Sequence, residues 1–366
     1  MKVALITIVD NVNFGTYLQA YATYRKLEER GYKITVVNYE RPYLTPMIEV
    51  KKNIQNPKWN ILRKMAYAAS YLIVEPFMRW NLKRFLRANC SITKCCKTEL
   101  EISGYVGGYD IFVTGSDQVW NTAHNHGIDR NFFWAGIEGR KYSYAASIGI
   151  DHFPDEQKEE IYQLLKQYKA ISVRENSAVK CLSEIGIDNT IQVLDPTLLL
   201  RGTDWNSIQK SKLKKTEPYL LVYSVEPKRV DFLKEQVQAI AKEKGLKIYV
   251  VCPSLKFKKD LGADKVFNFS TIDDFLYLFA NADFVVVSSF HGTAFSLNFN
   301  KEFITVSSGA FNSRVHSLLS LVGLTERYTT DRILSSNELN AVDYNRVNSI
   351  IDFERKKSES FIDKIR

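Results

Sequence analysis

The sequence predicts an α/β protein of two Rossmann-like, doubly wound domains that face each other across a cleft. Its length of 366 residues is more than one hydrophobic core comfortably supports. Short apolar runs alternate with helical patterns through both halves, which is typical of βαβ units and parallel sheets. Hydrophobic residues make up 45% and charged residues 25% of the chain, which excludes collagen-like, disordered and disulfide-scaffold classes.

The first domain is expected to span residues 1–205. An apolar run from Val3 to Ile8 is followed by a polar loop and by a helical pattern that ends at Gly31. Pro154 opens a further helix. The remaining strands of this half are predicted at residues 34–39, 109–114, 142–147, 170–173 and 191–194.

The second domain is expected to span residues 206–340 and repeats the same alternation. A polar, lysine-rich stretch from Leu213 to Pro218 is interpreted as the tail of an interdomain linker, and Gly245 stops the first helix of this half. Residues 341–366 are interpreted as a charged amphipathic helix that packs back on the first domain. Strands of this half are predicted at residues 219–225, 248–251, 284–287 and 303–306.

A basic helical insert is predicted at about residues 44–97. Between Lys51 and Lys97 there are eleven basic residues and a single acid, Glu75, so this segment carries a formal charge of +10. The formal net charge of the whole chain is +9, so the segment accounts for all of it. Aromatic and aliphatic residues are interleaved with the basic ones. Such an insert suits an anionic membrane surface, and it equally suits a solvated hairpin that buries its apolar face on the domain. No nucleic-acid-binding motif accompanies the charge, so no nucleic acid partner is expected.

The chain carries no signal for export or for a membrane span. The N-terminal apolar run is too short for a signal peptide, and no stretch of ~18 apolar residues occurs. A cytoplasmic protein is therefore expected, with peripheral association at the inner face of the cytoplasmic membrane through the insert. The five cysteines match no zinc pattern and are interpreted as reduced thiols.

No metal and no cofactor are expected. His124 and His126 flank Asn125 in a polar loop, but no third ligand at useful spacing supports a zinc site. Neither the phosphate-binding loop of nucleotide kinases nor the glycine-rich fingerprint of dinucleotide enzymes is present.

Polar clusters follow the predicted strands, and the strongest runs from Ser288 to Gly292. It lies between a buried strand and a helix, so unpaired N–H groups, Ser289, His291 and Gly292 suit a phosphate or carboxylate. Arg174 and Arg314 follow other predicted strands and add fixed positive charge for a dianion. The alternatives are a capped helix with a packed histidine, and arginines paired with Glu175 or Asp195. His316 is interpreted as a residue behind the site.

At these positions the sequence resembles the polysaccharide pyruvyl transferase family of bacteria. The resemblance covers about residues 1–330, in the family's order, and leaves out the insert and the C-terminal tail. The matching motifs are Asn13-Phe14-Gly15-Thr16-Tyr17-Leu18-Gln19, Gly115-Ser116-Asp117-Gln118-Val119-Trp120, Ala146-Ser147-Ile148-Gly149, Ser172-Val173-Arg174-Glu175, Asp195-Pro196, Ser289-Phe290-His291-Gly292 and Ser313-Arg314.

The resemblance implies a fold like that of the glycosyltransferase-B enzymes and a reaction with phosphoenolpyruvate as co-substrate. The enolpyruvyl unit would pass to two hydroxyls of one sugar in a polyprenyl-linked precursor of a capsule or exopolysaccharide, which leaves a cyclic ketal and phosphate. Arg174, His291 and Arg314 would hold the donor.

Further roles are assigned by chemistry and by loop position. His291 is the candidate acid, because histidine titrates near neutrality. Asp117 would orient or deprotonate an acceptor hydroxyl. The residues expected to bind the acceptor are Asn13, Thr16, Gln19 and Gln118.

Two other functions remain open. One is a nucleotide-sugar glycosyltransferase of the same fold, for which Glu226 is the best candidate to bind a ribose, although Pro227 follows it at a turn. The other is a non-catalytic saccharide-binding member of a capsule-assembly complex.

Overall fold

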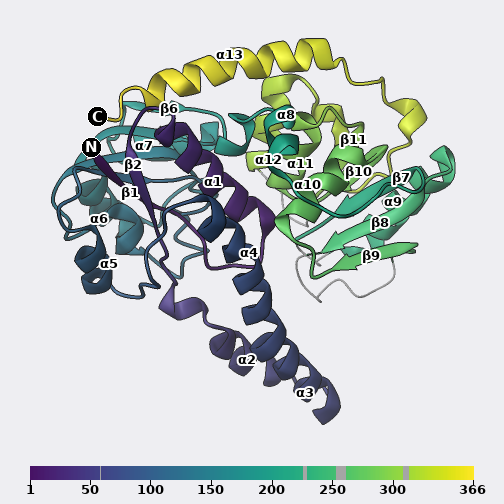
Figure 1. The fold of residues 1–366 in the computed structure, drawn as a ribbon, viewed down its shortest axis with the longest axis horizontal. Coiled ribbons are helices and arrows are strands. Elements are labelled where there is room, and N and C mark those ends of the chain that lie inside the picture. Colours follow the sequence, from purple (N-terminus) through teal and green to yellow (C-terminus); the bar gives the residue numbers. More distant parts are fainter. Residues whose placement is uncertain (58, 226–228, 253–260, 308–312) are drawn as a thin grey trace. The chain divides into compact units, whose positions relative to one another are not determined.

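The computed structural model describes residues 1–366 except 58, 226–228, 253–260 and 308–312 (Figure 1). The chain divides into two compact units. The first contains residues 1–12, 16–199 and 357–366, and the second contains residues 13–15 and 200–356. The division after Leu199 comes earlier in the chain than the boundary expected at residue 205, and the end of the chain groups with the first unit.

The first unit is built on a six-stranded sheet in the order β2-β1-β3-β4-β5-β6, with every neighbouring pair parallel. β1 and β3 are buried almost throughout because their apolar side chains face helices on both sides of the sheet. The strands are β1 (Lys2–Ile6), β2 (Lys33–Val37), β3 (Ile111–Thr114), β4 (Arg140–Ala146), β5 (Tyr168–Val173) and β6 (Thr190–Gln192).

Helices α5, α6 and α7 share one hydrophobic core with this sheet. The end of α13 also belongs to the first unit: the Phe361 ring lies 6.4 Å from the Tyr144 ring, and Ser358 Oγ accepts a hydrogen bond from the Leu194 N–H at 2.9 Å. The helices involved are α1 (Phe14–Glu28), α5 (Glu99–Val106), α6 (Asp155–Leu165), α7 (Asn176–Ser183) and α13 (Tyr344–Ile362).

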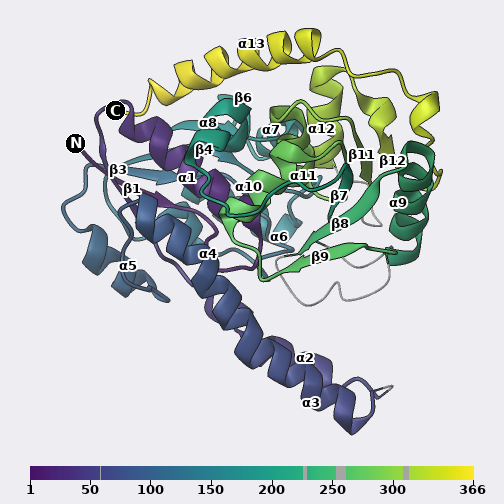
Figure 2. The same ribbon diagram turned by 45° about the vertical axis from the view of Figure 1, so that its right-hand side comes forward.

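A helical arm, residues 46–89, extends from the first unit. It consists of α2 (Pro46–Ile54), α3 (Ile61–Ala69), a π-helical turn (Ser70–Val74) and α4 (Glu75–Asn89). In both views α3 lies far from the strands while α4 leads back to the unit (Figures 1 and 2). The described residues of α3 include no buried side chain. The insert predicted from the charge pattern is therefore helical, and its outer part leaves its apolar side chains uncovered.

The second unit has its own six-stranded parallel sheet, in the order β12-β11-β10-β7-β8-β9. The two parallel sheets confirm the predicted fold class. β9 is not predicted from the sequence, because its residues are mostly exposed and show no apolar run. The strands are β7 (Tyr219–Tyr223), β8 (Lys247–Cys252), β9 (Lys265–Asn268), β10 (Phe284–Val287), β11 (Phe303–Val306) and β12 (Tyr328–Thr329).

The core of the second unit has two parts. Apolar residues of α9 pack with one face of the sheet, and an aromatic cluster of Tyr223, Phe275 and Phe295 joins the sheet to α10 and α11. Phe14 stacks on Phe275 at 4.7 Å, which explains why residues 13–15 group with this unit. The helices are α8 (Gly202–Ile208), α9 (Val230–Lys244), α10 (Ile272–Asn281), α11 (Phe290–Asn298) and α12 (Ser313–Val322).

Candidate active site

Each sheet has a point at which the order of its strands reverses. The chain passes from β1 to β2 on one side and then to β3 on the other, and from β7 to β8 and later to β10 in the same way. Neighbouring loops diverge at such a point and leave a crevice at the carboxyl ends of the strands, where open α/β sheets bind ligands. The loops after β1 and β3, and those after β7 and β10, carry the residues that the sequence singles out.

Asp117 follows β3 and is held in a fixed orientation. Its Oδ2 accepts a hydrogen bond from Thr16 Oγ1 at 3.0 Å, and its Oδ1 accepts one from the Gln118 N–H at 2.9 Å. Asp117 adopts φ = 76°, a left-handed conformation that costs a non-glycine residue about 1–3 kcal/mol. Its side chain is 10% exposed, so a ligand can still reach the carboxylate.

Arg174 lies beneath Asp117 at the end of β5. Its Nη1 donates to Asp195 Oδ2 at 2.9 Å, while Asp117 Oδ1 and Glu175 Oε2 lie 3.8 and 3.9 Å from other guanidinium nitrogens. Burial lowers the pKa of Arg174, but the negative charges of Asp195, Asp117 and Glu175 raise it by a larger amount. The net shift of the pKa is therefore upward.

The surroundings of Arg174 favour a positioning role. Its side chain is only 1% exposed and faces three carboxylates, so the cluster as a whole would repel a dianion. These contacts hold Asp117 and Asp195 in place, and the direct phosphate contact expected from the sequence stays a prediction. The contacts of Arg174 are those of the alternative named in the sequence analysis, in which the arginine pairs with carboxylates.

Two of the sequence motifs serve this cluster. Glu175 Oε1 accepts hydrogen bonds from Ser147 Oγ at 2.9 Å and from the next two backbone N–H groups at 2.9 and 3.0 Å. Asp195 Oδ1 accepts from the N–H and the hydroxyl of Thr197 at 2.9 and 2.7 Å. The loops after β4, β5 and β6 are thus tied together by buried charged groups, each of which is hydrogen-bonded to several donors.

Gln19 and Thr16, which the sequence assigns to acceptor binding, are buried inside the first unit. Both are 0% exposed. Gln19 Nε2 donates to Thr7 Oγ1 and to the Thr16 carbonyl, each at 2.9 Å, and Thr16 donates to Asp117. These hydrogen bonds hold the loop between β1 and α1 together, and the role of the two residues toward an acceptor stays a prediction.

Asn13 and Gln118 remain accessible in part. Asn13 Oδ1 accepts from the Gly15 N–H at 2.9 Å and from Tyr223 Oη at 3.1 Å, which leaves its amide nitrogen directed elsewhere. Gln118 Oε1 accepts from Asn121 Nδ2 at 2.6 Å. Both amides are oriented by their neighbours, as binding residues generally are.

In the second unit, His291 lies in the first turn of α11. Ser289 caps this helix by accepting from the Gly292 N–H at 3.1 Å, and Ser288 and Ser224 join the ends of β10 and β7 through hydroxyls 2.5 Å apart. The first N–H groups of α11, with the positive end of the helix dipole, face the reversal point of this sheet.

Gly15 allows the backbone to lie directly against His291. A Cβ atom at position 15 would stand 2.1 Å from Cγ of the imidazole ring. His291 as a whole residue is 5% exposed, and the Phe290 ring lies edge-on to its ring at 5.5 Å. The segment Asn13–Gly15 therefore fixes the orientation of the imidazole, a role that the sequence alone does not reveal.

Arg314 is half-buried in the first turn of α12, which follows β11. The neighbouring Asn312, and Glu226 as the candidate for a ribose contact, lie outside the described residues. His316 is exposed, with its Nδ1 3.3 Å from Ser320 Oγ, so it stands apart from the buried residues of this unit. Among the described residues, no group of three metal-ligating side chains is present.

A buried ion pair was not predicted from the sequence. Arg41 Nη2 lies 2.7 Å from Asp10 Oδ1, and Arg41 Nη1 donates to Asn125 Oδ1 at 2.9 Å. Burial raises the pKa of Asp10, but the charge and hydrogen bonds of Arg41 outweigh it and hold the pKa below its ordinary value. Asp10 follows β1 and Arg41 follows β2. Because these two strands are parallel neighbours, the sequence could have indicated that the two side chains lie close together.

Comparison with solved structures defines the class of the fold. A UDP-N-acetylglucosamine 2-epimerase structure superposes with a TM-score of 0.52 at 10% identity, covering 99% of this chain and 94% of the other. A protein from Listeria monocytogenes, described as an enzyme of the same kind, has a TM-score of 0.50 at 12% identity and covers 100% and 91%. The chain thus has the two-domain, glycosyltransferase-B-like fold.

The family follows from the sequence itself. The sequence profile of the polysaccharide pyruvyl transferase family matches residues 13–309, which is most of the chain. The chain therefore belongs to the polysaccharide pyruvyl transferase family. The match contains Asn13, Asp117, Arg174 and His291 and ends before Arg314. No curated protein matches the chain in overall sequence.

Proposed function

We propose that this protein transfers the enolpyruvyl unit of phosphoenolpyruvate onto two hydroxyls of one sugar, which forms a pyruvate ketal and releases phosphate. The observation that carries the proposal is the family match over residues 13–309, which includes His291 in the first turn of α11. The sugar would belong to a lipid-linked precursor of a capsule or other exported polysaccharide.

The donor side of the reaction is assigned to the second unit. The N–H groups that begin α11 and the guanidinium of Arg314 would bind the phosphate and carboxylate of phosphoenolpyruvate. His291 would protonate the methylene carbon, which makes the adjacent carbon electrophilic. Fixed positive groups stabilise the charge on the departing phosphate, so the chemistry requires no metal.

The acceptor side is assigned to Asp117, Asn13 and Gln118. The first hydroxyl attacks the electrophilic carbon, and its proton passes to Asp117. The bond from that carbon to the phosphate oxygen then breaks, the second hydroxyl attacks, and its proton leaves with the phosphate. Thr16 and Arg174 would hold Asp117 in its orientation through the contacts described above.

The product tests the proposal directly. The protein is incubated with carbon-labelled phosphoenolpyruvate and an acceptor glycan of the galactose type, and glycan and phosphate are analysed. We expect the glycan to gain a labelled ketal and one carboxylate, with one phosphate released for each ketal. Release of phosphate without labelled glycan would contradict ketal formation, and labelled glycan only from a nucleotide sugar would favour a glycosyltransferase.

We propose further that the helical arm docks on an anionic membrane surface. Its apolar side chains recur at intervals of three or four along α3 and α4, and Leu62, Met65 and Ile73 are 72%, 64% and 70% exposed. Basic side chains accompany them: the Arg63 guanidinium lies 4.9 Å from the Trp59 ring, and that of Arg84 lies 5.1 Å from the Trp80 ring. Apolar groups flanked by cations suit an interface with acidic headgroups.

Membrane docking would bring the enzyme to a lipid-linked acceptor without a spanning segment. Among the described residues, no helix combines the length and the apolar character needed to cross a bilayer.

A further inference from the structure

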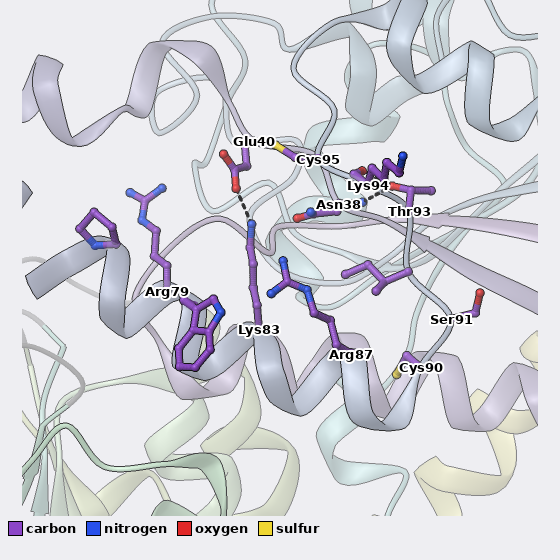
Figure 3. Close-up of a pocket in the computed structure, with 13 residues that line it drawn as sticks. Asn38, Glu40, Arg79, Lys83, Arg87, Cys90, Ser91, Thr93, Lys94 and Cys95 are labelled. Atoms are coloured by element: carbon purple, nitrogen blue, oxygen red, sulfur yellow. Dashed lines mark hydrogen bonds and ion pairs between the residues drawn. The ribbon is translucent and has the colours of Figure 1, made fainter. Parts of the chain in front are cut away.

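A basic pocket of about 910 Å³ lies at the base of the helical arm, wholly within the first unit (Figure 3). One wall is α4. The other is the segment 91–95, which runs beside β2 through the paired residues Val36 and Ile92 and reaches Cys96. Asn38, directly after β2, donates its N–H to Thr93 Oγ1 at 3.0 Å and so ties the segment 91–95 to the end of β2. The pocket therefore lies at the carboxyl edge of the first sheet, which is also the edge that carries the candidate acceptor residues of this unit.

The pocket is lined by four cations and one carboxylate, a formal charge of +3. Arg79, Lys83 and Arg87 are spaced by four residues on α4 and extend from the same side of the helix (Figure 3). Lys83 is buried and donates to Glu40 at 2.5 Å, and Arg79 donates to Glu75 outside the pocket at 2.7 Å. These pairs fix two of the cations in place.

The other two cations remain available to a ligand. Within the described ranges, the side chains of Arg87 and Lys94 form no ion pair or hydrogen bond, and both are exposed. Burial raises the pKa of the nearby Cys95 thiol to about 11, so the thiol stays neutral and does not offset these charges. An anion with several oxygens fits two free cations beside two fixed ones.

The apolar side of the pocket continues into the arm. Trp80 lines the pocket and is 49% exposed, and its ring stacks with that of Phe77, 6.1 Å away. From Phe77 the exposed apolar stripe runs through Ile73 toward α3. A ligand with a phosphate group and a long apolar chain would contact the cations and this stripe at the same time.

We propose that this pocket binds the phosphate or diphosphate group of a lipid whose chain lies along the apolar stripe of the arm. A free phosphate compound shares the same head chemistry, but it would leave the stripe unused. The identification of this lipid with the acceptor's carrier rests on the proposed function, whereas binding of the lipid does not. The assignment gives the arm a second task, which is to select one lipid from the membrane on which it docks.

Titration calorimetry with three probes tests the site: farnesyl diphosphate, inorganic diphosphate and farnesol. We expect farnesyl diphosphate to bind more tightly than either of the others. Replacing Arg87 and Lys94 together by Gln should weaken its binding about tenfold or more, because each charged hydrogen bond is worth roughly a factor of ten. The matched control replaces Lys64 and Lys97, two cations of the same segment outside the pocket, and should bind normally.

The substitution Glu40→Gln should have the opposite effect on the affinity for farnesyl diphosphate. It removes the carboxylate from the pocket while it keeps a hydrogen-bond partner for Lys83, so farnesyl diphosphate should bind more tightly. Unchanged binding in the Arg87/Lys94 variant would overturn the site, and equal affinity for inorganic diphosphate would assign it to a free phosphate compound. Equal affinity for farnesol, or no binding, would also overturn the proposal.

The same variants separate this inference from the proposed reaction. The Arg87/Lys94 variant should keep its response to phosphoenolpyruvate, which binds elsewhere. Binding of farnesyl diphosphate by a protein that ignores phosphoenolpyruvate would refute the reaction and leave the lipid site standing.

Discussion

His291 depends on the residue that packs against it, and Gly15 is that residue. Because a Cβ at position 15 would stand 2.1 Å from the ring, Gly15→Ala must displace the imidazole or the backbone. A displacement of about 1 Å near reacting atoms costs on the order of 10²-fold in rate. We expect kcat to fall by about that factor in steady-state assays, with a loss of stability of about 1–3 kcal/mol.

The matched control for that substitution is Gly104→Ala. Gly104 lies in the exposed part of α5 with open space around its Cβ position, so alanine should be neutral or stabilise by about 0.5–1 kcal/mol. Wild-type kcat in Gly15→Ala would refute the role of this contact.

Arg174 should matter for folding as well as for activity. Its removal in Arg174→Ala leaves Asp117, Asp195 and Glu175 close together without their shared cation, and breaking a buried ion pair costs about 3–5 kcal/mol. We expect a clear fall in melting temperature, partly restored in Arg174→Lys. A variant with wild-type melting temperature and selectively weakened phosphoenolpyruvate binding would instead support direct contact with the donor.

The Asp10–Arg41 pair predicts a pH-dependent stability. The pKa of Asp10 is held below its ordinary value of 3.8 in the folded protein, so its stabilising contribution is present above 3.8 and is lost as the pH falls through the lower folded value. At neutral pH, Asp10→Asn should unfold at a lower urea concentration than wild type. The two midpoints should converge below pH 3.8, and a constant difference would show that the charge of Asp10 is not the cause.

At the residue scale, the sequence predicts where a polar residue lies in the fold better than it predicts whether its side chain is exposed. Asp117, Arg174 and His291 all follow strands, and their places at the carboxyl edges could be read from the chain. Whether a polar side chain faces a ligand or its own loop depends on neighbours distant in sequence. Gln19 is buried because Thr7 and the Thr16 carbonyl accept its hydrogen bonds, and no local pattern indicates this.

At the scale of elements, the apolar runs predict the buried strands well, whereas β9 escapes because its side chains are mostly exposed. The arm is the opposite case: its helices are expected from the sequence, but the periodicity does not tell whether the apolar face is covered. The structure leaves Leu62, Met65 and Ile73 uncovered. This outcome distinguishes the arm from a hairpin packed on the domain along its whole length.

The exposed stripe can be tested by sedimentation with vesicles. Replacing Leu62, Met65 and Ile73 by Ser should abolish binding to phosphatidylglycerol vesicles, because exposed apolar side chains supply the insertion energy. Added salt should weaken wild-type binding, since charge attraction is screened over about 8–10 Å at ordinary ionic strength. The control exchanges three exposed side chains of two other helices, Leu100 and Tyr105 of α5 and Phe353 of α13, and should bind as wild type does. Salt-independent binding to neutral vesicles would contradict docking through charge.

At the scale of the whole molecule, the two sheets repeat one principle. Each has its order reversal beside its first strand, and each reversal holds buried polar residues: Asp117, with Arg174 of the loop after β5 beside it, in the first unit, and Ser224, Ser288 and His291 in the second. The fold class could be predicted because alternation and length determine it. Which residues lie at each reversal point could not be predicted, because this depends on which loops the topology brings there.

The last prediction separates pyruvyl transfer from sugar transfer. Phosphoenolpyruvate needs a site for one phosphate and one carboxylate, which His291, Arg314 and the first turn of α11 can supply, whereas a nucleotide sugar also needs contacts for a base and a ribose. We expect millimolar phosphoenolpyruvate to raise the melting temperature, and nucleotide sugars and chelators to leave it unchanged. Arg314→Ala should lose the shift, while Arg332→Ala, an exposed arginine paired with Glu338, should keep it. A shift with a nucleotide sugar and none with phosphoenolpyruvate would assign the site to a glycosyltransferase, because only a nucleotide pocket could then account for the stabilisation.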